Sequence, residues 1–230
     1  MATYVVIHGA GDVASNWDLA AAELRERGHD VVAVDLPCED DSAGWSEYAD
    51  TVIEAIGDRG DLVVVAHSLG GFTAPVVCDR VPVDLLVLVA GMIPSPGESG
   101  DEWWEASGCA QATRPAAEGP IATFLQDVAP DLAEAALSNE RAQSSTPGRQ
   151  QWPLDAWPDV PTRYLLCRDD RFLPADFARR HARERLGIAA DEIAGGHCPY
   201  LSRPRELAER LEAYRTAVVD SDSVASPGRP

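Results

Sequence analysis

Short, wholly apolar runs recur along this chain, and segments with helical spacing separate them. The clearest runs are Val63–Ala66 and Leu85–Ala90, which read VVVA and LLVLVA without a polar residue. Strands with this composition are typical of sheets that are covered by helices on both faces. The pattern therefore predicts an α/β fold with a mostly parallel, doubly wound sheet of about six strands.

Six runs rich in aliphatic and β-branched residues are predicted to be strands. They are Thr3–His8, Val31–Leu36, Leu62–Ala66, Leu85–Ala90, Thr162–Cys167 and a short run near Glu192–Ile193. The spacing of apolar residues predicts helices in the segments that follow them. These helices are Trp17–Arg27, Trp45–Ile56, Gly71–Arg80, Ala175–Leu186 and Pro204–Ala217.

The alternation of strands and helices is interrupted between residues 92 and 160. This segment contains prolines, glycines and four of the six tryptophans, with helical spacing only near Ile121–Asp127 and Leu132–Ala142. We therefore expect an α/β core from residues 1–91 and 161–217, with residues 92–160 as an insertion. The polar segment at residues 218–230 is predicted to be a disordered tail.

The charge of the chain limits the partners that it can bind. There are 38 acidic and 19 basic residues, which give a formal net charge of −19 at pH 7 and a pI near 4.5. Such a negative field repels nucleic-acid phosphates and anionic membrane surfaces. We expect neither a nucleic acid nor a membrane as a partner.

The cysteines and the first residues of the sequence point to a reduced, cytoplasmic protein. The five cysteines include no C-x-x-C pair, so neither a disulfide framework nor a zinc site is predicted. The opening MATYVVIHGAG has no charged segment before an apolar one, so no signal peptide is recognised. No apolar run is long enough to cross a membrane.

A single serine follows the third predicted strand, in the sequence AHSLGG. Ala66 stands two residues before Ser68 and Gly70 two residues after it. Small residues at these positions suit a tight strand-to-helix turn that exposes the serine at its tip. The helix that begins there would also direct backbone N–H groups toward the hydroxyl. The motif indicates a nucleophile, and a helix-capping serine is the alternative when it is read alone.

Three further motifs follow other predicted strands. HGAG occupies residues 8–11, CRDDRFLP residues 167–174 and GGHCPY residues 195–200. A nucleophilic serine needs a histidine base, which in turn needs a carboxylate to orient it. His197 is the candidate base, and either Asp169 or Asp170 can supply the carboxylate. Each motif has a structural alternative when it is read alone. HGAG is also typical of a glycine-rich turn, CRDDRFLP of a solvated charge cluster, and GGHCPY of a loop with a surface histidine.

Taken together, the four motifs resemble those of the α/β-hydrolase superfamily. The similarity is greatest to small bacterial esterase-like members that are related to plant methylesterases and hydroxynitrile lyases. HGAG, AHSLGG, DDRFLP and GGHCPYLSRP carry the resemblance, which extends from about Thr3 to Ala217. It implies a triad in the order serine, acid, histidine.

The resemblance also assigns roles that the residues alone leave open. In such families the acid commonly stands four residues before a proline, which selects Asp170, before Pro174, over Asp169. The oxyanion hole would consist of the backbone N–H groups of Ala10 and Leu69. The insertion would be a lid over the active site.

Two positions separate this chain from the related lyases. The lyases have threonine after the histidine of the first loop and lysine after the catalytic histidine, where this sequence has Gly9 and Cys198. The absence of that lysine favours an esterase.

The sequence thus predicts a serine carboxylesterase that acts through an acyl-enzyme and needs no cofactor or metal. Trp17, Trp103 and Trp104 are candidate contacts for a small apolar or aromatic ester, and the alternative for each is a place in the core. We expect a monomer or a homodimer. The alternative functions are a small-molecule receptor or scaffold, and cofactor-free C–C hydrolysis, lyase or perhydrolase chemistry at the same site.

Overall fold

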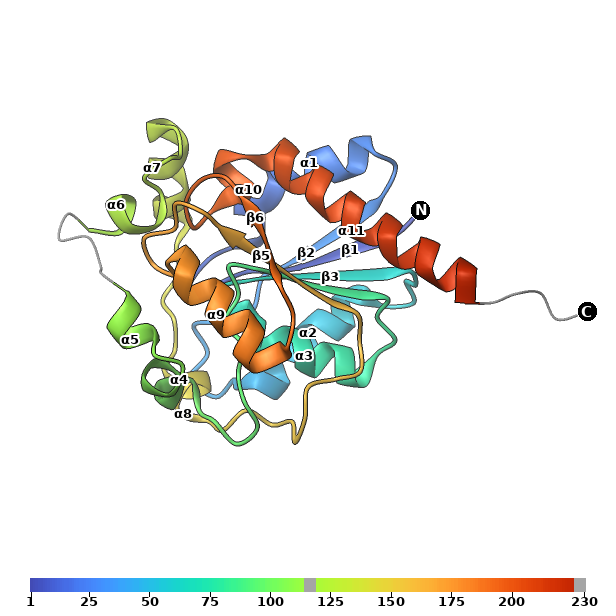
Figure 1. The fold of residues 1–230 in the computed structure, drawn as a ribbon. Coiled ribbons are helices and arrows are strands. Elements are labelled where there is room, and N and C mark those ends of the chain that lie inside the picture. Colours follow the sequence, from blue (N-terminus) through green and yellow to red (C-terminus); the bar gives the residue numbers. More distant parts are fainter. Residues whose placement is uncertain (114–118, 226–230) are drawn as a thin grey trace, which may run out of the picture.

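The computed structural model describes residues 1–113 and 119–225, with side chains up to Val219. Six parallel strands form one sheet in the order β2-β1-β3-β4-β5-β6 (Figure 1). Their bounds are Thr3–Ile7 (β1), Asp30–Val34 (β2), Leu62–His67 (β3), Leu85–Val89 (β4), Thr162–Cys167 (β5) and Ala190–Ile193 (β6). The predicted α/β fold with a parallel sheet is confirmed.

The apolar runs are explained by burial on both faces of the sheet. Along β1, Tyr4 and Val6 pack into one hydrophobic cluster, whereas Val5 and Ile7 pack into another. Successive side chains of a strand point to opposite faces. A strand covered on both sides must therefore be apolar at every position.

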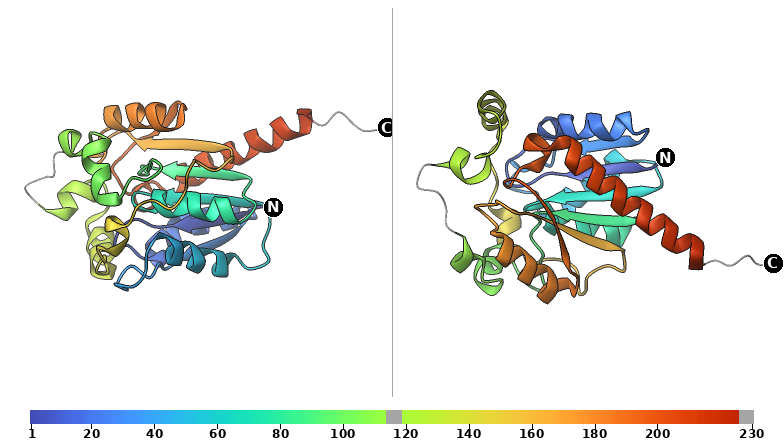
Figure 2. Two further views of the ribbon diagram at one scale, coloured as in Figure 1. Left: turned by 90° about the horizontal axis from the view of Figure 1, so that it is seen from below. Right: turned by 45° about the horizontal axis from the view of Figure 1, so that its top comes forward.

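Helices lie over each face of the sheet. α1 (Asp18–Glu26) and α11 (Pro204–Ala225) cover one face, and α2 (Trp45–Ile56), α3 (Gly70–Arg80) and α9 (Ala175–Leu186) cover the other (Figures 1 and 2). A short 3₁₀ helix, η1 (Ala14–Trp17), precedes α1.

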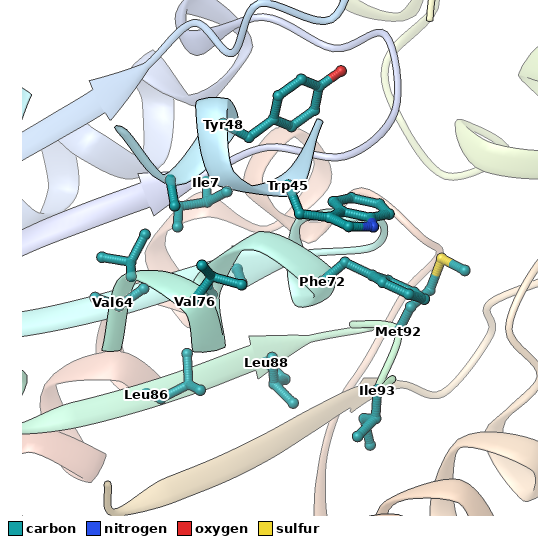
Figure 3. Packing of buried hydrophobic residues seen from close by; sticks show 14 of the residues in the cluster. Ile7, Trp45, Tyr48, Val64, Phe72, Val76, Leu86, Leu88, Met92 and Ile93 are labelled. Carbon is teal, nitrogen blue, oxygen red and sulfur yellow. The ribbon is translucent and has the colours of Figure 1, made fainter. Parts of the chain in front are cut away.

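Figure 3 shows how the second of these faces is packed. Strand residues such as Val64 and Leu86 meet Phe72 and Val76 from α3. Trp45 from α2 stacks on Phe72 with ring centroids 4.7 Å apart. This dense packing fixes α3, and with it the turn that precedes the helix.

The last helix is longer than its sequence suggests. The prediction of disorder from residue 218 onward requires correction, because α11 continues to Ala225. Leu207, Leu211, Tyr214 and Val218 are all buried against the sheet, at the spacing of one helix face. The apolar stripe therefore extends past Ala217, while residues 226–230 lie outside the described part of the chain.

The helices of the insertion between β4 and β5 lie beyond the carboxyl end of the sheet, and the segment after them runs back to the start of β5 (Figures 1 and 2). Its helices in the described residues are α4 (Gly100–Ala106), α5 (Cys109–Ala112), α6 (Pro120–Phe124), α7 (Pro130–Asn139) and α8 (Thr146–Arg149). Another short helix, α10 (Pro199–Ser202), lies between β6 and α11. Among the described residues, no helix is both long and apolar enough to cross a membrane.

Candidate active site

Ser68 lies in the turn between β3 and α3. Its φ of 51° is in the left-handed region, which residues other than glycine rarely adopt. The neighbouring backbone holds this conformation, because Met92 donates its N–H to the Ser68 carbonyl at 2.9 Å. Gly71 is required here, since a Cβ at that position would lie 2.0 Å from the Met92 carbonyl oxygen. The turn therefore stores backbone strain at a single hydroxyl-bearing residue.

A buried hydrogen bond joins His197 to Asp170. His197 Nδ1 lies 2.7 Å from Asp170 Oδ2, and the two side chains are 4% and 0% exposed. The other carboxylate oxygen, Oδ1, accepts the backbone N–H groups of Phe172 (2.8 Å) and Leu173 (3.0 Å). An ionised carboxylate only accepts hydrogen bonds, so Nδ1 of His197 carries the proton and Nε2 has a free lone pair.

The neighbouring aspartate has a different environment. Asp169 Oδ2 accepts the backbone N–H of Gly195 at 3.0 Å, and its side chain is 59% exposed. The contacts thus distinguish the two candidate carboxylates, and Asp170 is the one that faces His197.

The loop after β1 presents backbone donors beside Ser68. Gly9, Ala10, Ser68 and Leu69 all line one cavity. His8 Nδ1 donates to the Gly9 carbonyl at 2.7 Å, while its Nε2 accepts the Leu36 N–H at 3.1 Å. Burial lowers the pKa of His8, so the imidazole stays neutral and keeps both bonds. His8 thereby fixes the shape of the loop that carries Ala10.

The cavity has a volume of about 350 Å³ and is lined by both the core and the insertion. Ser68 and His197 lie on its core side. From the insertion, Trp104 and Phe124 supply apolar surface and Glu140 a carboxylate. Its walls are mainly apolar with a few polar groups, which is typical of a small-molecule site.

The structure separates the three tryptophans for which substrate contact is predicted. Trp104 lines the cavity, whereas Trp17 and Trp103 do not. Trp103 is wholly buried, donates to the Ile93 carbonyl at 2.9 Å and packs against His181. Trp17 is also buried. The contacts expected of Trp17 and Trp103 therefore require correction, because both indoles are enclosed by protein.

The glycines before His197 have a partner that the sequence does not reveal. Asp127, which follows α6 in the insertion, accepts the Gly196 N–H through Oδ2 at 2.9 Å. A Cβ on Gly196 would lie 2.5 Å from Gln126 Nε2 and 2.7 Å from Asp127 Oδ1. The small residue thus makes room for a carboxylate that holds the histidine loop.

Some residues around the site were not recognised from sequence. His67 packs beside His197, with ring centroids 4.6 Å apart, and its Nε2 donates to the His197 carbonyl at 2.9 Å. Burial, and then the proximity of His197, keep the pKa of His67 well below its usual value, so it stays neutral. Asp12 and Tyr200 also line the cavity. Asp12 directly follows the motif HGAG, and Tyr200 is the last residue of GGHCPY. Their positions beside these motifs are the sequence signal that could have indicated them.

The sequence profile of the family described as "Alpha/beta hydrolase family" matches residues 4–210. The chain belongs to the alpha/beta hydrolase family. It is 26% identical to Methylesterase 7 of Arabidopsis thaliana, over 90% of this chain and 94% of the relative. It is 22% identical to Norfluorocurarine synthase 1 of a Strychnos species, over 94% of this chain and 96% of the relative.

Solved structures share the fold of this chain. The crystal structure of polyneuridine aldehyde esterase superposes with a TM-score of 0.79 at 20% identity, covering 93% of this chain and 98% of that one. The identification of the chain as an α/β-hydrolase related to plant methylesterases is thus confirmed, and its relatives include esterases.

Proposed function

We propose that this α/β-hydrolase is a serine carboxylesterase. The observation that carries the proposal is the buried hydrogen bond between His197 and Asp170, at the wall of a cavity that Ser68 also lines. The bond leaves Nε2 of His197 as the base, which is the arrangement that activates a serine.

In the first half of the reaction, Ser68 Oγ attacks the ester carbonyl carbon and its proton moves to Nε2 of His197. The backbone N–H groups of Ala10 and Leu69 stabilise the oxyanion of the tetrahedral intermediate. Neither amide donates a hydrogen bond within residues 1–113 and 119–225, so both are available. Asp170 stabilises the imidazolium that forms.

In the second half, the bond between the carbonyl carbon and the alcohol oxygen breaks. His197 returns its proton to the leaving alkoxide, and the acyl group stays on Ser68. A water molecule then attacks the acyl-enzyme and gives its proton to His197, after which Ser68 leaves as the hydroxyl and the carboxylic acid is released.

The lining of the cavity supports a small ester with an apolar or aromatic part. Trp104, Phe124 and Phe172 provide aromatic surface, and the rings of Phe124 and Phe172 lie 5.5 and 5.2 Å from the His197 ring. We propose that residues 92–160 act as the lid, because this segment supplies Trp104 and Phe124. Methylesterase and esterase names among the relatives support the same reaction class.

Covalent labelling combined with turnover tests this proposal. A fluorophosphonate probe should label the wild-type protein once, and mass spectrometry should locate the adduct on Ser68. The Ser68→Ala variant should neither label nor hydrolyse any member of a panel of apolar and aromatic esters.

The control is a melting curve, which should show that Ser68→Ala remains folded. Tight binding of a panel ester without turnover by the wild type would favour a receptor instead. Labelling at another serine would exclude the proposed nucleophile.

A further inference from the structure

Two loops of the proposed catalytic site come from strands that are not neighbours. The oxyanion loop, residues 8–12, follows β1, and the histidine loop, residues 195–200, follows β6. β3, β4 and β5 lie between these two strands in the sheet. Strand pairing therefore does not hold one loop against the other, although the reaction needs Ala10 and His197 in a fixed relative position.

One buried hydrogen bond joins the two loops. Tyr200, at the end of the histidine loop, donates its hydroxyl to Asp12 Oδ2 at 2.8 Å. Asp12 and Tyr200 are only 8% and 3% exposed. The second oxygen of Asp12, Oδ1, accepts two hydrogen bonds, from Asn16 Nδ2 at 2.6 Å and from the Val13 N–H at 2.9 Å. Three hydrogen bonds thus hold this carboxylate in place at the wall of the cavity.

The tyrosine ring is equally constrained. It stacks on Trp17 with centroids 4.2 Å apart and an interplanar angle of 13°, and it meets the His67 ring edge-on at 5.1 Å. Burial, followed by the nearby Cys198 and Asp12, raises the pKa of Tyr200, so the hydroxyl keeps its proton and remains a donor.

We propose that Asp12 and Tyr200 are positioning residues, whose hydrogen bond sets the oxyanion loop in register with His197. The proposal rests on the esterase function proposed above. It assigns a role to Trp17 as well: the indole lies outside the cavity and supports the ring of Tyr200.

The test compares two tyrosine-to-phenylalanine variants. Tyr200→Phe removes one hydroxyl and leaves the stacked ring in place. Tyr4→Phe is the matched control, because Tyr4 is also buried and donates to a carboxylate, Glu212, at 3.3 Å, but neither residue lines the cavity. Both variants lose a hydrogen bond from a buried tyrosine to a carboxylate, so both should lower the melting temperature.

Only Tyr200→Phe should change the chemistry. We expect kcat to fall by about ten- to a hundred-fold, the range of a hydrogen bond to a charged group, with KM unchanged within about three-fold. A trifluoromethyl ketone forms an oxyanion on the serine, and its affinity should fall by about the same factor as kcat. Tyr4→Phe should keep the wild-type kcat and ketone affinity.

A second variant covers the case in which Tyr200→Phe does not fold. Asp12→Ala removes the acceptor of the Tyr200 hydroxyl and should lower kcat and ketone affinity by at least the same factor. The variant that combines Tyr200→Phe with Asp12→Ala should lose no more than the more impaired single variant, because both changes remove the same hydrogen bond.

Three results would overturn the proposal: wild-type kcat in Tyr200→Phe, a raised KM with unchanged kcat, or additive losses in the double variant. If the wild-type protein itself neither hydrolyses esters nor labels with a fluorophosphonate, the esterase function fails instead.

Discussion

Replacing Asp170 by asparagine changes one atom at the centre of the proposed triad. Oδ1 of Asp170 accepts two backbone N–H groups, from Phe172 and Leu173, and only an oxygen can occupy that position. The amide oxygen of the introduced asparagine must therefore take the place of Oδ1. Its NH₂ group is then directed at His197 Nδ1, which has to become an acceptor.

The consequence is the wrong tautomer of His197. With Nδ1 unprotonated, the proton sits on Nε2, which can no longer accept the proton of Ser68. We expect kcat to fall by about 10⁴-fold, or about 5.5 kcal/mol of transition-state stabilisation. The two bonds to the backbone persist, so the melting temperature should change little.

The assay is steady-state hydrolysis of the best ester from the panel, with a melting curve for each variant. Asp169→Asn is the matched control, because Asp169 is exposed and contacts the Gly195 N–H rather than His197. Its kcat should remain within about ten-fold of wild type. A loss of less than ten-fold in Asp170→Asn, or a larger loss in Asp169→Asn, would refute the argument from tautomers.

Three further outcomes follow from the contacts around the site. Trp104→Ala should change the ratio of kcat/KM between short and bulky esters by about ten-fold or more, whereas Trp103→Ala should lower the unfolding free energy by about 3–5 kcal/mol and affect all esters alike. Gly196→Ala should lower kcat at least about ten-fold, because its Cβ would displace the side chains of Gln126 and Asp127 and weaken the bond that holds Gly196; unchanged kcat would contradict this. Burial lowers the pKa of His181 to about 3, so unfolding takes up a proton below about pH 6.5 and stability falls as the pH falls. The free energy of unfolding in urea should fall between pH 7 and pH 5, and this fall should be about 2 kcal/mol smaller in His181→Gln than in the wild type. Equal falls would refute the role of His181 in the pH dependence.

Local sequence determined the elements of this fold. The runs VVVA and LLVLVA predict strands that are buried on both sides, and β3 and β4 are such strands. Three predicted elements, Trp45–Ile56, Thr162–Cys167 and Ala175–Leu186, have the bounds found in the structure. Their patterns repeat within a few residues, so neighbouring positions are sufficient to reveal them.

Motifs at strand ends also predicted which residues gather at one edge of the sheet. The carboxyl ends of parallel strands meet at the same edge, so Ser68 after β3 and His197 after β6 had to lie on the same side. The residues alone could not choose between Asp169 and Asp170. Adjacent side chains diverge in direction, and only the folded loop shows which carboxylate meets His197.

The tertiary structure alone decided the contacts between distant segments. Trp103 and Trp104 are neighbours of the same type, yet the orientation of α4 buries one indole and directs the other into the cavity. Asp12 and Tyr200 are 188 positions apart, and no local pattern predicts that they meet. Periodicity and turn chemistry act over short distances along the chain, whereas these pairings depend on how the whole sheet and its loops come together.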